Sequence, residues 1–190
     1  MPRLWNDTIE THRRDVRNAI LDAAGSLANE HGVLSATMSR IAEEAGIGRA
    51  TLYKYFPDAE AVLYAWHERH VSEHREQLTE LASGDDPAEK RLEASLAGYA
   101  RICHFRARHG APDVGALVHQ GAAVSDAEKQ LAKLFRDLLA ECQAASEVRD
   151  DISADELAAY CLHALSAAAS LPSEAATKRL VAVTMSALRR

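Results

Sequence analysis

Cationic, hydroxyl and aromatic side chains are concentrated in one short stretch, GIGRATLYKYF, at residues 46–56. Arg49 carries a planar guanidinium that can pair with two acceptors at once, and Lys54 adds a point charge. The stretch also contains three hydroxyls that can donate to phosphate oxygens, those of Thr51, Tyr53 and Tyr55. Such a set suits a polyanion. On duplex DNA, Arg49 would pair bidentately with guanine, the Thr51 methyl would touch thymine, and Lys54 would serve a base or a phosphate.

Three histidines at helical spacing form a second group of reactive side chains, His67, His70 and His74. The segment HVSEH at 70–74 fits a pattern in which two histidines bind zinc and a glutamate, here Glu73, acts as a base. This leaves a metal-responsive regulator, or a zinc hydrolase, as the alternative function. No third ligand follows nearby in the sequence, whereas zinc sites take three or four protein ligands. We therefore expect no metal, no cofactor and no enzymatic activity.

The composition is that of a globular protein without a strong overall charge preference. The chain has 28 acidic and 22 basic residues and a net charge of −6. All of this net negative charge lies in the residues after Phe56. It contains no apolar run long enough to cross a membrane and no apolar signal-peptide core at its start, so we expect a cytoplasmic protein. The three cysteines lie far apart and are interpreted as reduced, apolar core residues.

Apolar residues recur at helical spacing in every long segment, and no segment alternates like a strand. Caps and breakers divide the chain into about nine helices. The first carries the stripe from Val16 to Ala28 and ends at Gly32, and the second runs from Thr37 to Gly46. The third spans Arg49–Phe56 before Pro57. Later helices are expected after Asp58, Asp86, Ser125, Ser153 and Pro172, with a short one around Val114–His119.

The residues before Val16 are expected to be a frayed, solvated tail. This segment contains Arg3, Arg13 and Arg14, so the alternative is an arm that touches the minor groove of DNA.

Two short helices joined by a glycine-containing turn, residues 37–56, are the pattern of a helix-turn-helix motif. In such a motif the second helix enters the major groove and the first braces it. Leu52 and Phe56 are four residues apart and are expected to face inward toward Ile41 and Ala45. The remaining polar side chains of the second helix would then face the partner.

The segment TMSRIAEEAGIGRATLYKYFPDAEAVL, Thr37–Leu63, resembles the N-terminal signature of the TetR family of bacterial transcriptional regulators. The preceding AILDAAGSLANEHG also resembles the first helix of that family, so the similarity covers residues 16–64. It implies an all-α homodimer with a helix-turn-helix domain, residues 1–57, and a helical ligand-binding and dimerisation domain, residues 58–190. It also implies a regulator, usually a repressor, that a small molecule releases from a palindromic operator.

The resemblance also implies roles for individual residues. Thr37 would contact a phosphate at the start of its helix, and Ser39 and Arg40 would lie beside the groove. The base-side residues would be Arg49, Ala50, Thr51 and Lys54, with Tyr53 and Tyr55 on phosphates. The sequence departs from the family pattern at Ala59, where a phosphate-binding lysine is common, and at Gly48, where a polar helix cap is common.

The second part of the chain specifies its ligand weakly. Several residues with polar or polarisable tips fall on otherwise apolar helical stripes, which suits a small-molecule pocket. These candidates are Trp66, His67, His70, Tyr99, Cys103, Phe135 and Tyr160. The last two helices are rich in alanine, which permits close helix approach. The family resemblance implies that they pair with their copies in the dimer.

Overall fold

The computed structural model describes residues 3–109 and 122–189, with side chains for residues 9–105 and 126–189. All regular structure in these residues is helical, and eight α-helices and two short 3₁₀ helices follow one another without a strand. The all-α prediction is therefore confirmed, and the predicted number of about nine helices is close. The short helix expected at Val114–His119 lies outside the described residues.

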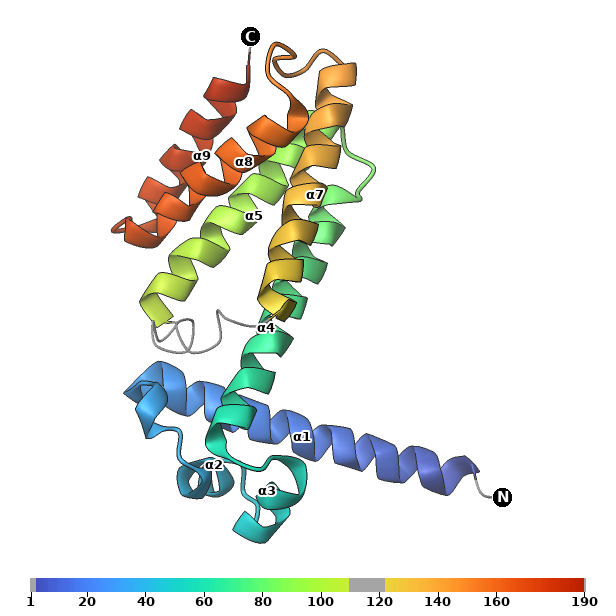
Figure 1. Ribbon diagram of the computed structural model, residues 1–190, viewed down its shortest axis with the longest axis vertical. Helices are drawn as coiled ribbons and strands as arrows, with labels where there is room; N and C mark the ends of the chain where they lie inside the picture. The colour runs from blue at the N-terminus through green and yellow to red at the C-terminus, as the bar shows by residue number, and fades with distance from the viewer. Residues whose placement is uncertain (1–2, 110–121, 190) are drawn as a thin grey trace. The chain divides into compact units, whose positions relative to one another are not determined.

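Two compact units divide the described chain. The first contains the helices up to His70, and the second begins at Val71. The division falls inside a single helix, α4 (Ala59–Ala82) (Figure 1). The predicted boundary between a DNA-binding domain, residues 1–57, and a ligand-binding and dimerisation domain, residues 58–190, concerns function and stays a prediction.

The first unit begins with a long helix, α1 (Arg3–His31). Its C-terminal half carries the predicted apolar stripe, in which Ile20, Leu21 and Ala24 are 0% exposed. The helix ends at Gly32, whose φ of 81° is a conformation that glycine adopts without steric cost. A 3₁₀ turn, η1 (Val33–Ser35), then leads to α2 (Met38–Glu44) and α3 (Arg49–Tyr55). The expectation of a frayed N-terminal tail is wrong, because α1 begins at Arg3.

Two side-chain contacts join α4 to α1 within the first unit. Arg69 forms an ion pair with Asp22. Trp66 is 7% exposed and lies against Gly25, and its ring meets the ring of His70 edge-on at a centroid distance of 5.0 Å. The N-terminal part of α4 is therefore anchored to the helix on which the motif also packs.

The second unit is a helical bundle around α5 (Ala88–His109). Its other members are the part of α4 from Val71 onward, α7 (Ala122–Ala144), α8 (Ala154–Ser166) and α9 (Glu174–Leu188), with η2 (Ala167–Ser170) between the last two. Helix α7 starts before Ser125, so the cap predicted there is wrong. The capping box at the start of α8 is present, because Ser153 and Glu156 bond reciprocally.

The core of the second unit contains the three cysteine thiols. Burial is the main reason that the pKa of Cys142 rises to about 12 and that of Cys161 also rises to about 12. Both thiols stay protonated at neutral pH and pack as small apolar groups, as the sequence indicated.

Candidate nucleic-acid interface

The turn between α2 and α3 is closed by backbone hydrogen bonds of a specific pattern. The amide of Ile47 donates to the carbonyl of Ala42 at 3.0 Å, and the amide of Gly46 donates to that of Glu43 at 3.1 Å. These two bonds form a Schellman cap, which requires a left-handed residue, and Gly46 has a φ of 64°. Because the cap fixes the direction in which the chain leaves α2, it also fixes where α3 begins.

Each helix of the motif starts at the residue that the sequence indicated. The Thr37 side chain caps α2 by accepting from the Arg40 amide at 3.4 Å. Gly48 occupies the cap position of α3 and has no side chain to accept a hydrogen bond. Its carbonyl accepts from the amides of Thr51 and Leu52 at 2.9 and 3.1 Å, so the helix begins there nonetheless.

The inner face of α3 is fully apolar. Leu52 is 0% exposed and Phe56 6% exposed, and α2 contributes Ile41, which is 0% exposed. Phe56 leaves the helical conformation with φ −140° and ψ 136°, so α3 ends there before Pro57. The guanidinium of Arg17 on α1 lies 5.3 Å from the centre of the Phe56 ring. The Phe56 side chain at the end of α3 is thus both buried and in contact with α1.

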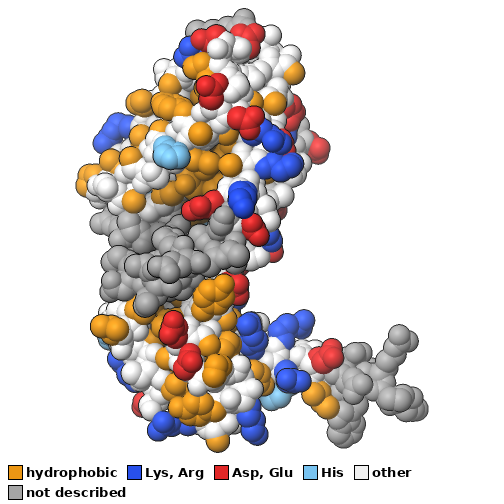
Figure 2. Space-filling model, in the orientation of Figure 1, with side chains coloured by type: hydrophobic (Ala, Val, Ile, Leu, Met, Phe, Trp, Pro, Cys, Tyr) orange, Lys and Arg blue, Asp and Glu red, His pale blue; other side chains and the backbone are white. Residues whose placement is uncertain are grey.

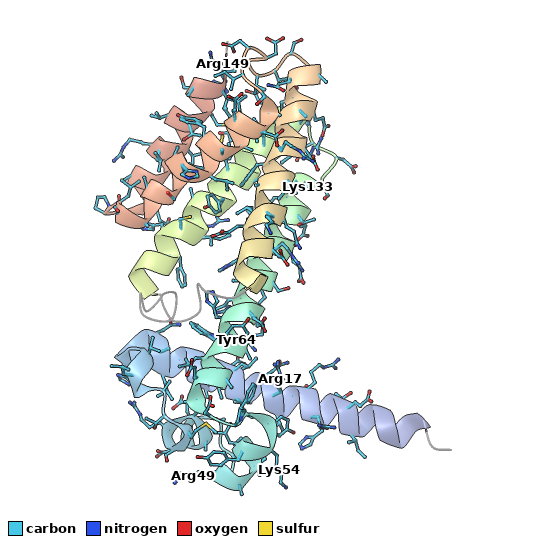
Figure 3. The ribbon with its side chains drawn as sticks, in the orientation of Figure 1. Arg17, Arg49, Lys54, Tyr64, Lys133 and Arg149 are labelled. Atoms are coloured by element: carbon cyan, nitrogen blue, oxygen red, sulfur yellow. The ribbon has the colours of Figure 1, made fainter. Side chains whose placement is uncertain are left out.

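The outer face of α3 is polar and accessible. Arg49 and Ala50 are exposed at its start, and Tyr53, which is 50% exposed, and Lys54 are exposed one turn later. Figure 3 shows Arg49 and Lys54 on the outer side of the motif. Thr51 and Tyr55 are half-buried. The helix therefore presents two cations and a phenol on one surface, which matches the chemistry of phosphates and base edges.

Helix α2 adds polar residues next to this surface. Thr37 and Ser39 are exposed, while Arg40 is half-buried because its guanidinium donates to the Ser35 carbonyl at 3.4 Å. The structure therefore brings the predicted DNA-side residues together on α2 and α3, within one compact unit. Whether each contacts DNA stays a prediction.

Sequence reasoning did not identify Arg17 as part of this region. Its contact with Phe56 joins residues 39 positions apart, and only the i, i+4 spacing between Arg13 and Arg17 indicated that the two share a helix face.

The predicted ligand residues fall into three groups. Trp66, His67 and His70 belong to the first unit. Tyr99, Cys103 and Phe135 lie in or against the core of the second unit, where the Tyr99 and Phe135 rings meet edge-on at 5.9 Å. Tyr160 is 43% exposed on α8. Within the residues that the structure describes, no three His, Cys, Asp or Glu side chains gather in a way that would hold a metal ion.

Comparisons with known proteins agree with this geometry. Two family models match, "Bacterial regulatory proteins, tetR family" over residues 20–65 and "Transcriptional regulator SbtR-like, C-terminal domain" over residues 104–190. An uncharacterized HTH-type transcriptional regulator of Mycobacterium tuberculosis is 40% identical over 74 residues. That match spans 38% of this chain and 37% of the relative, so this chain aligns with about a third of the length of that curated protein.

Two solved structures share the fold. A TetR/AcrR-family regulator of Thermobifida fusca superposes with a TM-score of 0.73 at 21% identity, over 93% of this chain and all of that one. FadR of Bacillus subtilis, solved in complex with stearoyl-CoA, superposes with a TM-score of 0.70 at 15% identity, over 90% of this chain and 98% of its own. None of the helices that the structure describes could span a membrane. With family models matched at both its N-terminal motif and its C-terminal helices, the chain belongs to the TetR family of bacterial transcriptional regulators.

Proposed function

We propose that this chain binds an operator in duplex DNA as a homodimer, through α3 in the major groove, and represses transcription until a small molecule releases it. Family membership makes it a transcriptional regulator and not an enzyme. The observation that carries the DNA-binding part is the division of α3 into two faces. Leu52 and Phe56 are buried, while Arg49, Tyr53 and Lys54 are exposed.

The two faces give each candidate residue a role. Arg49, Ala50, Thr51 and Lys54 lie on the turns that would enter the groove, and Arg49 is the residue that can distinguish guanine. Tyr53 and Tyr55 would donate to phosphate oxygens and set the depth of the helix. Thr37, Ser39 and Arg40 would hold the phosphates that flank the groove. The base contacts would supply sequence preference and the phosphate contacts most of the affinity.

Exposed small and apolar residues on the last two helices support a dimer. On α9 the exposed residues Ala175, Ala182 and Val183 fall on one face, and Val183 is 63% exposed. On α8 the neighbouring residues Ala159 and Tyr160 are also exposed. Figure 2 shows hydrophobic side chains gathered over the upper part of the molecule, where Figure 1 places these helices. Pairing of this face with its copy would present two α3 helices to a palindromic operator.

The second unit is the proposed site of the effector. The Tyr99 ring on α5 meets the Phe135 ring on α7, and Cys103 lies in the same apolar core, which carries the Tyr99 hydroxyl at its edge. A small molecule with an apolar part and one hydrogen-bonding group suits such surroundings. The complex of B. subtilis FadR with stearoyl-CoA supports the small-molecule part of this proposal. Effector and operator would oppose each other because each binds best to a different dimer geometry. The protein would act in the cytoplasm, where the DNA is.

Selection of bound sequences from random duplex DNA tests the proposed function. The recovered site is expected to be palindromic, and its affinity is then measured by fluorescence anisotropy with wild-type protein and variants. Arg49→Ala should weaken binding to the selected site about tenfold or more, because a bidentate base contact is worth about 1–3 kcal/mol. Tyr53→Phe should weaken binding to every sequence alike, because it removes a phosphate contact.

Lys90→Ala is the matched control, since it removes an exposed cation from α5 in the second unit. It should leave the affinity unchanged. Recovery of no preferred sequence, or equal binding by wild type, Arg49→Ala and Tyr53→Phe, would show that α3 does not read DNA.

A further inference from the structure

The N-terminal half of α1 extends beyond the body of the first unit. The buried stripe of α1 starts at Ile20, while every residue from Ile9 to Asp15 is exposed. Residues 3–19 of the helix therefore precede this buried stripe, a length of about 25 Å at 1.5 Å per residue. Figure 1 shows α1 extending past α2 and α3 toward the N-terminus.

The exposed stretch from Ile9 to Asp15 has no buried apolar face that would hold it on the core. A surface helix is normally retained by an apolar face packed on the core. In this segment the side chains that recur on one face are arginines: Arg13 and Arg14 lie four and three residues before Arg17. At about 100° per residue, both fall within about 60° of the Arg17 direction.

The contact of Arg17 with the Phe56 ring fixes where this face points. Phe56 ends α3, so the Arg17 side of α1 is the side on which α3 lies. Arg13 and Arg14 continue that side outward, past the end of the motif. Figure 2 shows Lys and Arg side chains along this part of α1.

Acidic residues are distributed unequally around the same helix. Asp15 lies two residues from Arg17 and therefore on the opposite side, at about 160° from it. Glu10 is the one acidic residue of the exposed stretch from Ile9 to Asp15 that shares the arginine face, at about 20° from Arg17. The face beside α3 is thus cationic and the face away from it is not.

We propose that this arginine face, Arg13, Arg14 and Arg17, binds the phosphate backbone of duplex DNA outside the base pairs that α3 reads. The inference rests on the proposed function, because it needs the DNA to be held by α3 first. Its partner follows from charge complementarity and from its position beside the C-terminal end of α3, where Arg17 contacts Phe56. The face holds the flanking backbone through guanidinium–phosphate pairs and adds affinity without sequence preference.

Two duplexes with the same selected site test this inference. The short duplex ends at the edges of the site, and the long duplex continues on both sides by about one helical turn. Wild-type protein should bind the long duplex more tightly, with a steeper dependence of affinity on salt. The double variant Arg13→Ala/Arg14→Ala should lose this advantage and bind both duplexes as the wild type binds the short one. Its salt slope on the long duplex should fall by about one for each phosphate that it no longer neutralises.

A pair of single substitutions controls for net charge. Glu10→Gln and Asp15→Asn each remove one negative charge from the exposed part of α1. Only Glu10→Gln lies on the arginine face, so it should tighten binding to the long duplex, while Asp15→Asn should leave it unchanged. Circular dichroism of the double variant checks that α1 is retained, as expected from the high helix propensity of alanine.

The outcomes separate the inference from the proposed function. If wild type and Arg49→Ala bind all DNA equally, the proposed function fails and this inference fails with it. If Arg49→Ala loses the site while Arg13→Ala/Arg14→Ala keeps the wild-type preference for the long duplex, the inference alone is overturned. Equal effects of Glu10→Gln and Asp15→Asn would also overturn it, because they would reduce the effect to total charge.

Discussion

The indole of Trp66 occupies the space that a side chain at position 25 would need. A β-carbon on Gly25 would lie 2.9 Å from Cε2 of Trp66, closer than real β-carbons approach other atoms. The glycine is therefore required by contact between helices, and its backbone conformation is an ordinary helical one. This contact, together with the Arg69–Asp22 ion pair, holds α4 on α1.

Gly25→Ala is expected to destabilise the first unit. Alanine in place of glycine inside a helix normally stabilises by about 1 kcal/mol, but here the added methyl must displace the indole, and overpacking costs about 1–3 kcal/mol. Urea denaturation followed by tryptophan fluorescence measures the change.

Gly98→Ala on α5 is the matched control, because its added methyl would meet only the flexible ends of Leu78 and Leu81, at 3.1 and 3.0 Å. Its change in unfolding free energy should be smaller. A gain in stability from Gly25→Ala would show that Trp66 moves aside without cost.

Val183→Glu is expected to convert the proposed dimer into monomers. The side chain is exposed on α9, so the folded chain accommodates the carboxylate, whereas a paired face would bury two of them. Sedimentation velocity gives the mass of the species in solution. Ala140→Glu, at an exposed position of α7, should leave the mass unchanged. A wild-type protein that sediments as a monomer would contradict the proposed interface.

Phe135→Ala is expected to destabilise the second unit strongly. Phe135 is 0% exposed and packs edge-on against Tyr99, so its removal leaves a cavity that costs about 3–5 kcal/mol. Tyr99→Phe keeps the ring and removes only the hydroxyl, and should change the unfolding free energy by less than about 1 kcal/mol. Urea denaturation compares the two. If Phe135→Ala were tolerated as well as Tyr99→Phe, the ring would not be part of the core.

The capping box of α8 predicts a pH effect. The Ser153 hydroxyl and then its amide donate to the Glu156 carboxylate, at 2.6 and 3.2 Å, and lower the pKa of Glu156. A lowered pKa contributes stability that is present above the ordinary glutamate pKa and is lost as the pH falls through the folded value. Ser153→Ala should therefore reduce stability at neutral pH and flatten its decline between about pH 5 and 3.

Melting temperatures across this range measure the effect. Ser166→Ala, which changes a hydroxyl at the other end of α8, is the control, because that hydroxyl donates to the His163 carbonyl and contacts no carboxylate in the bonds described. Parallel pH curves for wild type and Ser153→Ala would contradict the prediction.

Local features of the motif could be read from the sequence, because short-range chemistry determines them. Thr37, Gly46 and Pro57 mark the helix ends, and the i, i+4 pair Leu52 and Phe56 marks the buried face. These are the signals that caps, turns and periodicity provide.

The start of α1 could not be read in this way. Residues before Val16 carry no apolar stripe and no cap signal, so their sequence resembles that of a solvated tail. The end of α7 likewise carries no glycine that would mark it in the sequence. Ser146 adopts a φ of 60° in a Schellman cap, a position where glycine is the usual signal. The contact of Trp66 with Gly25 joins distant residues and leaves no local pattern.

Helix α4 contains neither glycine nor proline between Ala59 and Ala82, and the boundary between the two compact units falls inside it. The chain therefore passes from one unit to the next as continuous helix, without an irregular linker. Inserting one residue into a continuous helix turns the residues after it by about 100° and advances them by about 1.5 Å. An insertion between Trp66 and Arg69 would therefore turn one of the two side chains that hold α4 on α1 away from its contact.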